Sequence, residues 1–189
     1  MDDLDDVEVS DCATDTTSPL PNIPDSLLTC LRESFGETPK SISLLPNLTM
    51  KGIVYSAASR HTGNSSVLIH SGRPGVLIPA QIQYFVQLVL PDNINSLVTF
   101  VAARRYLPAN VKQDPFSTYP FLRAELWSRE LDSESESLGL YTPECIESHF
   151  AYLPMEWEER QVMAIISLSR VSYSLNTIDI LLIVDSKEH

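Results

Sequence analysis

Residues 75–108 read G-V-L-I-P-A-Q-I-Q-Y-F-V-Q-L-V-L, then P-D-N-I-N-S, then L-V-T-F-V-A-A-R-R-Y-L-P. Two runs rich in β-branched and aromatic residues flank a connection of Pro, Asp, Asn and Ser, a pattern typical of paired antiparallel strands. We therefore expect a long hairpin here. The rest of the chain should add strands to it and close a small β-domain.

The first run also predicts which faces of its strand are buried. Alternation predicts that Ile82, Tyr84 and Val86 share one face of a strand that is buried on one side. The opposite face would then carry Gln81, Gln83, Phe85 and Gln87. Pro79 marks a bend or an edge position.

Further strands are expected on both sides of this hairpin. They are predicted at residues 50–57, 67–70, 122–127, 146–152 and 162–169, with turn signals between them. M-E-W-E-E-R, at residues 155–160, is interpreted as a charged excursion, and residues 178–184 as a last strand or an extended segment against the helix described next. About seven short strands predict a mainly β fold, either a small, partly open β-barrel or a strongly bent sheet.

One helix is expected, near the N-terminus. Leu27, Leu28, Leu31 and Phe35 recur at helical spacing, Pro24 or Asp25 stands near the start, and Gly36 offers a stop. This short amphipathic helix should pack on the β-domain or on a partner. Residues 1–23 are acidic and rich in Ser, Thr and Pro, which predicts a disordered tail. This tail is either a solubilising leader or an acidic segment that attracts a basic partner. Residues 24–189 are then one domain.

The charge and the cysteines narrow the classes of partner and compartment. The net charge is -12, but eight of the acids lie in residues 1–25, and the remainder has 17 acids against 13 bases. Electrostatic binding of nucleic-acid phosphates over a broad surface is therefore disfavoured. Three widely spaced cysteines without a C-x-x-C pair argue against a disulfide framework or a zinc site. With no signal peptide and no apolar run of about 20 residues, we expect a soluble intracellular protein without membrane contact.

The sequence contains no convincing catalytic motif. His61 lies close to Ser65 and Ser66, but no G-x-S-x-G elbow accompanies it, so a turn stabilised by side-chain caps is the preferred interpretation. His149 is expected to be a buried structural histidine. The acids are scattered, and a Gly-rich phosphate loop is absent. We therefore predict a non-enzymatic protein with no catalytic residues, no metal and no cofactor.

Two segments are candidates for contact with a partner. The loop D-P-F-S-T-Y-P-F, at residues 114–121, presents aromatic residues beside the predicted sheet, although Phe116 and Phe121 could instead plug an open barrel end. Arg104 and Arg105 should point to opposite faces of their strand. One of them could anchor a phosphate or an acidic peptide, or pair with an acid such as Glu125.

Four motifs together resemble bromo-adjacent homology (BAH) domains. They are P-A-Q-I-Q-Y-F at 79–85, R-R-Y-L-P at 104–108, A-E-L-W-S at 124–128 and T-P-E-C-I-E-S-H-F at 142–150. With K-G-I-V-Y-S and H-T-G-N-S-S-V, the pattern is also similar to a β-rich region near the C-terminus of transposon-derived proteins of mushroom-forming fungi. The resemblance spans about residues 24–170. It implies a partly open SH3/BAH-like β-barrel that serves binding, commonly in chromatin.

The resemblance also implies a ligand site. Readers of methylated lysine in this family use an aromatic cage, and Tyr84 and Tyr106 match its strands. Arg104 stands where a tryptophan is usual, and Trp127 either substitutes for it or is a packing residue. With Phe116 from the loop, the predicted ligand-binding residues are Tyr84, Tyr106, Trp127, Phe116 and Arg104.

The expected function is a nuclear binding module for a protein or histone-type peptide. The alternative is an accessory DNA-binding or complex-assembly domain of a transposon-derived protein. In that alternative the nucleic-acid backbone would meet Arg60, Arg73, Arg104 and Arg105.

Overall fold

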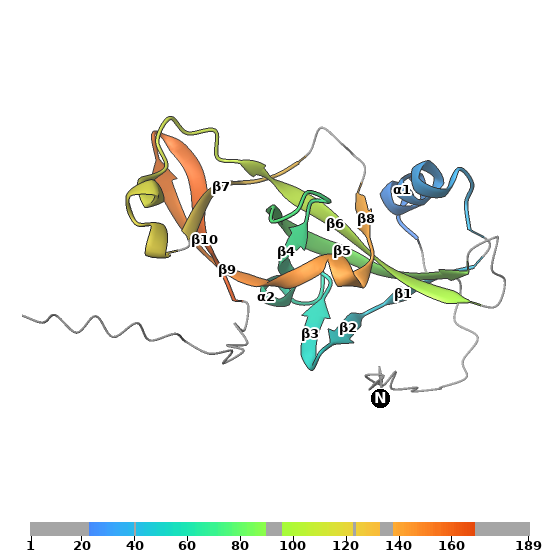
Figure 1. Cartoon of the computed structure of the whole chain (residues 1–189). Coiled ribbons are helices and arrows are strands. Elements are labelled where there is room, and N and C mark those ends of the chain that lie inside the picture. Colours follow the sequence, from blue (N-terminus) through green and yellow to red (C-terminus); the bar gives the residue numbers. More distant parts are fainter. Residues whose placement is uncertain (1–22, 40, 90–95, 123, 133–137, 169–189) are drawn as a thin grey trace, which may run out of the picture.

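The computed structural model describes residues 23–39, 41–89, 96–122, 124–132 and 138–168 (Figure 1). The expected tail, apart from residue 23, and the segment 178–184 lie outside the described residues. The described chain is mainly β, with a large antiparallel sheet and few helices. Its elements are α1 (Asp25–Phe35), β1 (Ile42–Leu45), β2 (Asn47–Met50), β3 (Ile53–Ser56), α2 (Thr62–Ser65), β4 (Ser66–His70), β5 (Leu77–Val89), β6 (Leu97–Pro108), η1 (Pro115–Thr118), η2 (Pro120–Leu122), β7 (Ala124–Leu131), β8 (Gly139–Tyr141), η3 (Pro143–Cys145), β9 (Ile146–Trp157) and β10 (Arg160–Ser167).

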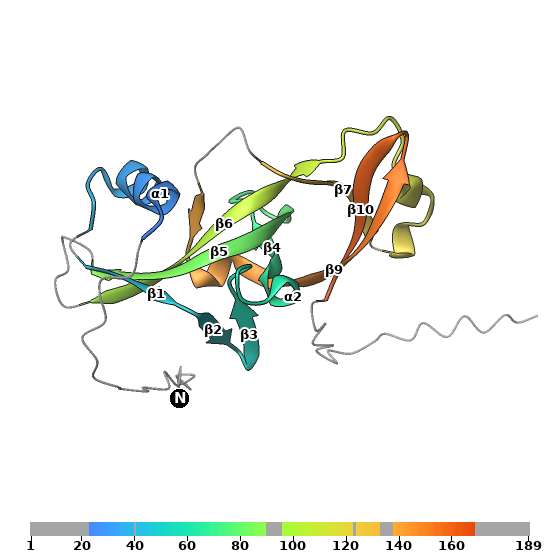
Figure 2. The ribbon, with the colours of Figure 1, turned by 180° about the vertical axis from the view of Figure 1, so that it is seen from behind.

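The expected long hairpin is confirmed. β5 and β6 pair antiparallel from Ala80 opposite Arg105 to Val89 opposite Leu97. The pairing continues through almost the whole length of both strands. The hairpin therefore forms the central support of the molecule (Figures 1 and 2).

The prediction that β5 is buried on one side is wrong. The register with β6 shifts between Ile82 and Tyr84, which is a β-bulge. A bulge inserts one extra residue and inverts the alternation of faces beyond it. Ile82 and Phe85 consequently lie in one core cluster, whereas Val86 lies in another with Tyr84 packed against it. Phe85, placed on a polar face by simple alternation, is fully buried.

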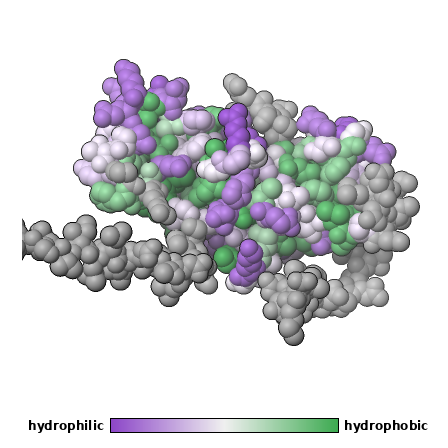
Figure 3. Space-filling view, in the orientation of Figure 1, coloured by the Kyte–Doolittle hydropathy of each residue, from purple (hydrophilic) through white to green (hydrophobic). Residues whose placement is uncertain are grey.

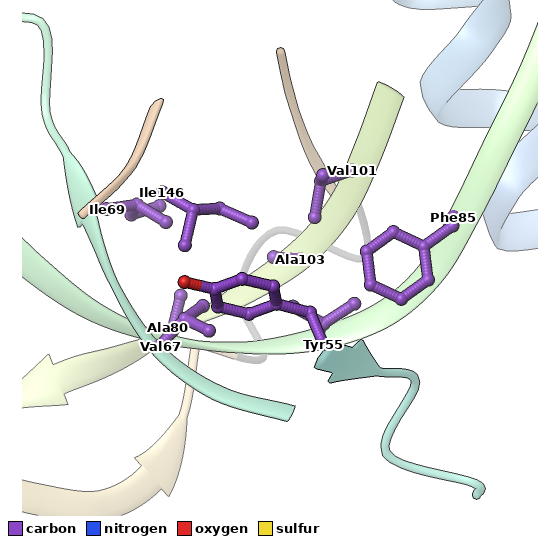
Figure 4. Packing of buried hydrophobic residues seen from close by; sticks show 9 residues of the cluster. Tyr55, Val67, Ile69, Ala80, Phe85, Val101, Ala103 and Ile146 are labelled. Carbon is purple, nitrogen blue, oxygen red and sulfur yellow. The ribbon is translucent and has the colours of Figure 1, made fainter. Parts of the chain in front are cut away.

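Both faces of the hairpin are thus covered by apolar side chains. On one face Tyr55 of β3 packs among side chains of β4, β5, β6 and β9, as Figure 4 shows. On the other face α1 contributes Leu27, Cys30 and Leu31, which pack with Val86 and Leu88. α1 occupies the residues for which helical spacing predicts a helix and ends at Gly36, whose φ of 77° suits glycine.

The strand pairings make β6 and β9 common to two parts of the sheet. The order is β1-β5-β4-β9-β10-β7-β6-β8, and β5 also pairs with β6; β2 and β3 form a separate pair. β9 pairs with β4 through its first residues and with β10 through the rest. β6 pairs with β5 over most of its length and with β7 at its end. The two views of the ribbon show β9 passing from one part to the other.

The segment 155–160 also differs from expectation. Instead of an excursion, β9 continues to Trp157 and β10 begins at Arg160, so Glu158 and Glu159 alone form the turn. Both have positive φ, 49° and 59°, as a tight hairpin turn requires. The sequence did not predict this turn because Glu158 and Glu159 occupy the positions where Gly or Asn usually marks a tight turn.

Candidate aromatic binding surface

The second part of the sheet places β7, β10 and β9 side by side. Its register sets Trp127 opposite Met163, and both Glu125 and Tyr152 opposite Ile165. Residues directly opposite each other in a sheet project from the same face. Glu125, Trp127 and Tyr152 therefore share one face, although they come from strands far apart in the sequence.

Four rings gather on this face, and we name Tyr106, Trp127, Phe150 and Tyr152 the aromatic cluster. Phe150 is buried at its centre. The ring of Tyr106 meets that of Phe150 edge to face with centroids 6.1 Å apart, and the ring of Tyr152 lies 6.2 Å from it, tilted. Trp127 packs against the same buried group, which includes Met163. Tyr106 and Trp127 are half-buried and Tyr152 is 45% exposed, so the cluster reaches the surface.

The electrostatics of the cluster favour a cation. The carboxylate of Glu125 is exposed and accepts a hydrogen bond of 3.0 Å from Nε1 of Trp127. Burial raises the pKa of the Tyr106 phenol, and Tyr152 raises it further, while a hydrogen bond with Ser66 acts in the opposite direction. Tyr106 is therefore neutral at physiological pH. The face offers ring surfaces beside one negative charge.

The structure brings together two of the five predicted ligand-binding residues, Tyr106 and Trp127. Tyr84 lies elsewhere: the register sets it opposite Ala102, four residues along β6 from Tyr106, and it packs against the buried residues beneath α1. It lines a cavity of about 230 Å³ together with Leu44, Leu45, Pro46, Ala57, Ser59, Arg60, Gln83 and Phe85. Phe116, on η1, packs with Leu126 and Val162 on the opposite face of β7 and β10.

Arg104 lines a different cavity. This cavity of about 240 Å³ is formed by Ala103, Arg104, Arg105, Asp132, Leu138, Gly139 and Tyr141. Arg105 donates a 2.6 Å hydrogen bond from Nε to the Tyr141 hydroxyl, and its guanidinium lies 5.7 Å from the centre of that ring. Neighbouring arginines that were expected on opposite faces thus line one cavity. Glu125 is hydrogen-bonded to Trp127 rather than to either arginine.

Sequence reasoning missed three residues of this surface: Glu125, Phe150 and Tyr152. A signal for the last two was present, because two aromatic residues at spacing i, i+2 on one strand project from the same face. Glu125 and Trp127 have the same spacing. No signal along the sequence showed that these two strands lie on either side of β10.

Two of the histidines, His61 and His149, have structural partners. Nδ1 of His61 accepts a 3.1 Å hydrogen bond from the Asn64 backbone N–H at the start of α2, and the Ser65 hydroxyl donates to the Thr62 carbonyl. This is the capped turn that the sequence favours. His149 stacks on Tyr55 with ring centroids 4.4 Å apart. In the part of the chain that the structure describes, no three His, Cys, Asp or Glu side chains form a group able to hold a metal ion.

None of the helices in the described ranges is both long and apolar enough to span a lipid bilayer. Comparison with known proteins adds no assignment: no family model, no curated protein and no solved structure matches this chain.

Proposed function

We propose that this chain is a non-enzymatic, BAH-like binding module that holds a methylated lysine of a histone-type peptide on the aromatic cluster. The observation that carries the proposal is the gathering of Tyr106, Trp127 and Tyr152 around Phe150, with the Glu125 carboxylate at its edge. Such a module would act in the nucleus.

Methylated lysine suits this surface for physical reasons. A quaternary ammonium is attracted to the electron-rich faces of aromatic rings, and each such contact contributes about 0.5–2 kcal/mol, depending on desolvation. Methylation also removes N–H groups that would otherwise need hydrogen-bond partners. The Glu125 carboxylate adds Coulomb attraction, and its bond to Trp127 fixes the indole beside the charge.

The pairing of the strands supports the architectural side of the proposal. Following neighbours through β5, β4, β9, β10, β7 and β6 returns to β5, with β1 and β8 attached outside this ring. We interpret this ring as a partly open, SH3/BAH-like barrel within one domain. In it the aromatic cluster would lie where β7, β9 and β10 meet the end of β6.

The test is binding of the full chain to histone-type peptides that carry lysine with zero to three methyl groups, measured by calorimetry. We expect a preference for the methylated forms and a loss of affinity of about tenfold or more in Trp127→Ala, since a hot-spot aromatic contributes at least about 1.4 kcal/mol. Tyr119→Ala is the matched control. It removes an aromatic side chain that is 52% exposed on the η1–η2 loop and lies outside the cluster.

Glu125→Gln separates charge from shape. The glutamine oxygen can still accept the Trp127 hydrogen bond, so only the negative charge is lost. We expect weaker binding, with the largest difference at low salt. Affinity that is indifferent to methylation, or unchanged in both Trp127→Ala and Tyr152→Ala, would refute the proposal.

One observation favours the alternative function in DNA binding or complex assembly. Arg104 and Arg105 both line one cavity, whose lining also includes Asp132 and Tyr141, and Arg105 is hydrogen-bonded to the Tyr141 hydroxyl. If the cavity meets a nucleic-acid backbone, affinity for a short duplex falls steeply with salt. Arg104→Ala should then reduce the slope of log K against log salt by about one.

A further inference from the structure

Within the described ranges, the face of β7, β9 and β10 opposite the aromatic cluster is covered at one end. There Phe116 of η1 packs with Leu126, Met155 and Val162. The backbone N–H groups of Lys112 and Gln113 donate to the Glu158 carboxylate at 3.0 and 3.3 Å, which fastens the covering loop to the β9–β10 turn.

The other end of this face is apolar and open to solvent. We name Leu153, Ile166 and Leu168 the apolar strip; their side chains are 66%, 45% and 55% exposed. Leu153 lies opposite Ala164, and Ile166 opposite Ala151, so the register places them on the same face as Val162. Figure 3 shows hydrophobic surface, in green, at the end of the molecule where β7, β9, β10 and the η1–η2 loop lie.

The described chain ends at this strip. The Leu168 N–H donates a 2.9 Å hydrogen bond to the His149 carbonyl, so the backbone still follows β9 when it leaves the described residues. Residues 169–189 come next. Among them, residues 178–184 read I-D-I-L-L-I-V, a segment that is apolar except for one aspartate.

The connection between strip and segment is long enough for an intramolecular contact. Residues 169–177 can span up to about 30 Å when extended. The distance along β10 from Leu168 back to Val162, which the connection must span, is about 20 Å. A short tether also gives the segment an effective concentration in the millimolar range, which no separate partner easily matches.

We propose that residues 178–184 of this chain bind the apolar strip and complete the cover of this face. The sequence of this segment has apolar residues at alternate positions, Ile178, Ile180, Leu182 and Val184, a spacing of two that suits contact with an apolar sheet face. Large exposed apolar patches commonly mark such docking sites. This inference goes beyond the proposed function, because it concerns the face opposite the aromatic cluster.

Hydrogen exchange of the full chain, followed by mass spectrometry, tests this contact. We expect peptides that cover residues 178–184 to exchange at least about tenfold more slowly than an unfolded chain, because a docked segment exchanges only when it opens. Leu153→Asp should abolish this protection, since it places a charge in the strip at a position that is 66% exposed. Leu97→Asp is the matched control: it alters a leucine that is 59% exposed at the start of β6 and should leave the protection intact.

A second variant tests the same contact from the other partner. Leu182→Asp should remove the protection of the segment and raise the exchange of β10 amides near Ile166. Exchange of residues 178–184 at the unfolded rate in the full chain would overturn the proposal, and so would protection that survives Leu153→Asp. Protection that depends on protein concentration and accompanies a dimer in sedimentation would assign the strip to a second copy and overturn it as well.

Discussion

At the scale of single residues, His149 shows how packing fixes a protonation state. Its ring stacks on Tyr55 at an interplanar angle of 24°, and Nε2–H donates to the Asn64 carbonyl at 3.1 Å. Burial lowers the pKa of His149, and the bond to Asn64 acts in the opposite direction. The folded protein thus favours the neutral ring.

This lowered pKa makes stability depend on pH. Unfolded histidine takes up a proton near pH 6.5, whereas folded His149 does so only at lower pH. The unfolded state therefore binds more protons in this window, and the free energy of unfolding rises with pH. We expect stability to fall as pH is lowered from about 6.5 towards the folded pKa. His149→Phe keeps an aromatic ring on Tyr55 and should lack this part of the slope.

Urea unfolding at a series of pH values between neutral and mildly acidic measures the effect. His61→Asn is a suitable control, since asparagine can still cap α2 and the His149 contribution should persist. An identical slope in His149→Phe and the parent protein would show that His149 does not titrate differently on folding.

At the scale of elements, the β9–β10 turn combines local strain with a tertiary contact. Glu158 and Glu159 both adopt the left-handed conformation that disfavours side chains. Glu158 compensates through its two hydrogen bonds to the Lys112 and Gln113 backbone N–H groups. Trp157 adds a third link, from Nε1 to the Gln113 carbonyl at 3.0 Å. None of these three hydrogen bonds involves the Glu159 side chain.

Substitutions in this turn should consequently have opposite effects. Glu159→Gly relieves the left-handed strain, but glycine also increases the conformational entropy of the unfolded state, which opposes this gain. The net effect should be a stabilisation of up to about 1 kcal/mol. Glu158→Ala keeps the strain, loses both bonds to the loop and should destabilise it by about 1–3 kcal/mol. Chemical denaturation measures both effects: an unchanged free energy of unfolding in Glu158→Ala would mean that its carboxylate contributes nothing to the loop.

At the scale of the whole molecule, the shared strands β6 and β9 should make unfolding cooperative. Met163 is buried in the cluster beneath the aromatic rings, and Phe85 in the cluster around Tyr55. Met163→Ala should lower the free energy of unfolding by about 2–5 kcal/mol. Because β6 and β9 take part in both regions, amide exchange should accelerate in β5 as much as in β10.

Phe85→Ala is the reciprocal variant and should accelerate exchange in β10 as much as in β5. Exchange that accelerates only around the altered side chain would contradict this expectation. It would show two regions that unfold separately despite their common strands.

The extent to which the sequence predicts this molecule also depends on scale. The β5–β6 hairpin and α1 follow from local periodicity, which the chain expresses over a few neighbouring residues. The bulge at Gln83 does not, since a single inserted residue leaves the apolar pattern unchanged while it moves Phe85 to the other face. The meeting of Tyr106, Trp127 and Tyr152 depends on register between distant strands, which no local pattern encodes.

The dependence of β4 on β9 has a consequence for synthesis on the ribosome. One edge of β4 pairs with β5, which follows it directly in the chain. Its other edge pairs with β9, where Val67 lies opposite His149. At about 5–20 residues per second, β9 follows β4 only after about 4–15 s. During that interval the nascent chain carries an unpaired strand edge, the feature that promotes aggregation between chains. The demand for chaperones should therefore fall once β9 has left the ribosome and paired with β4.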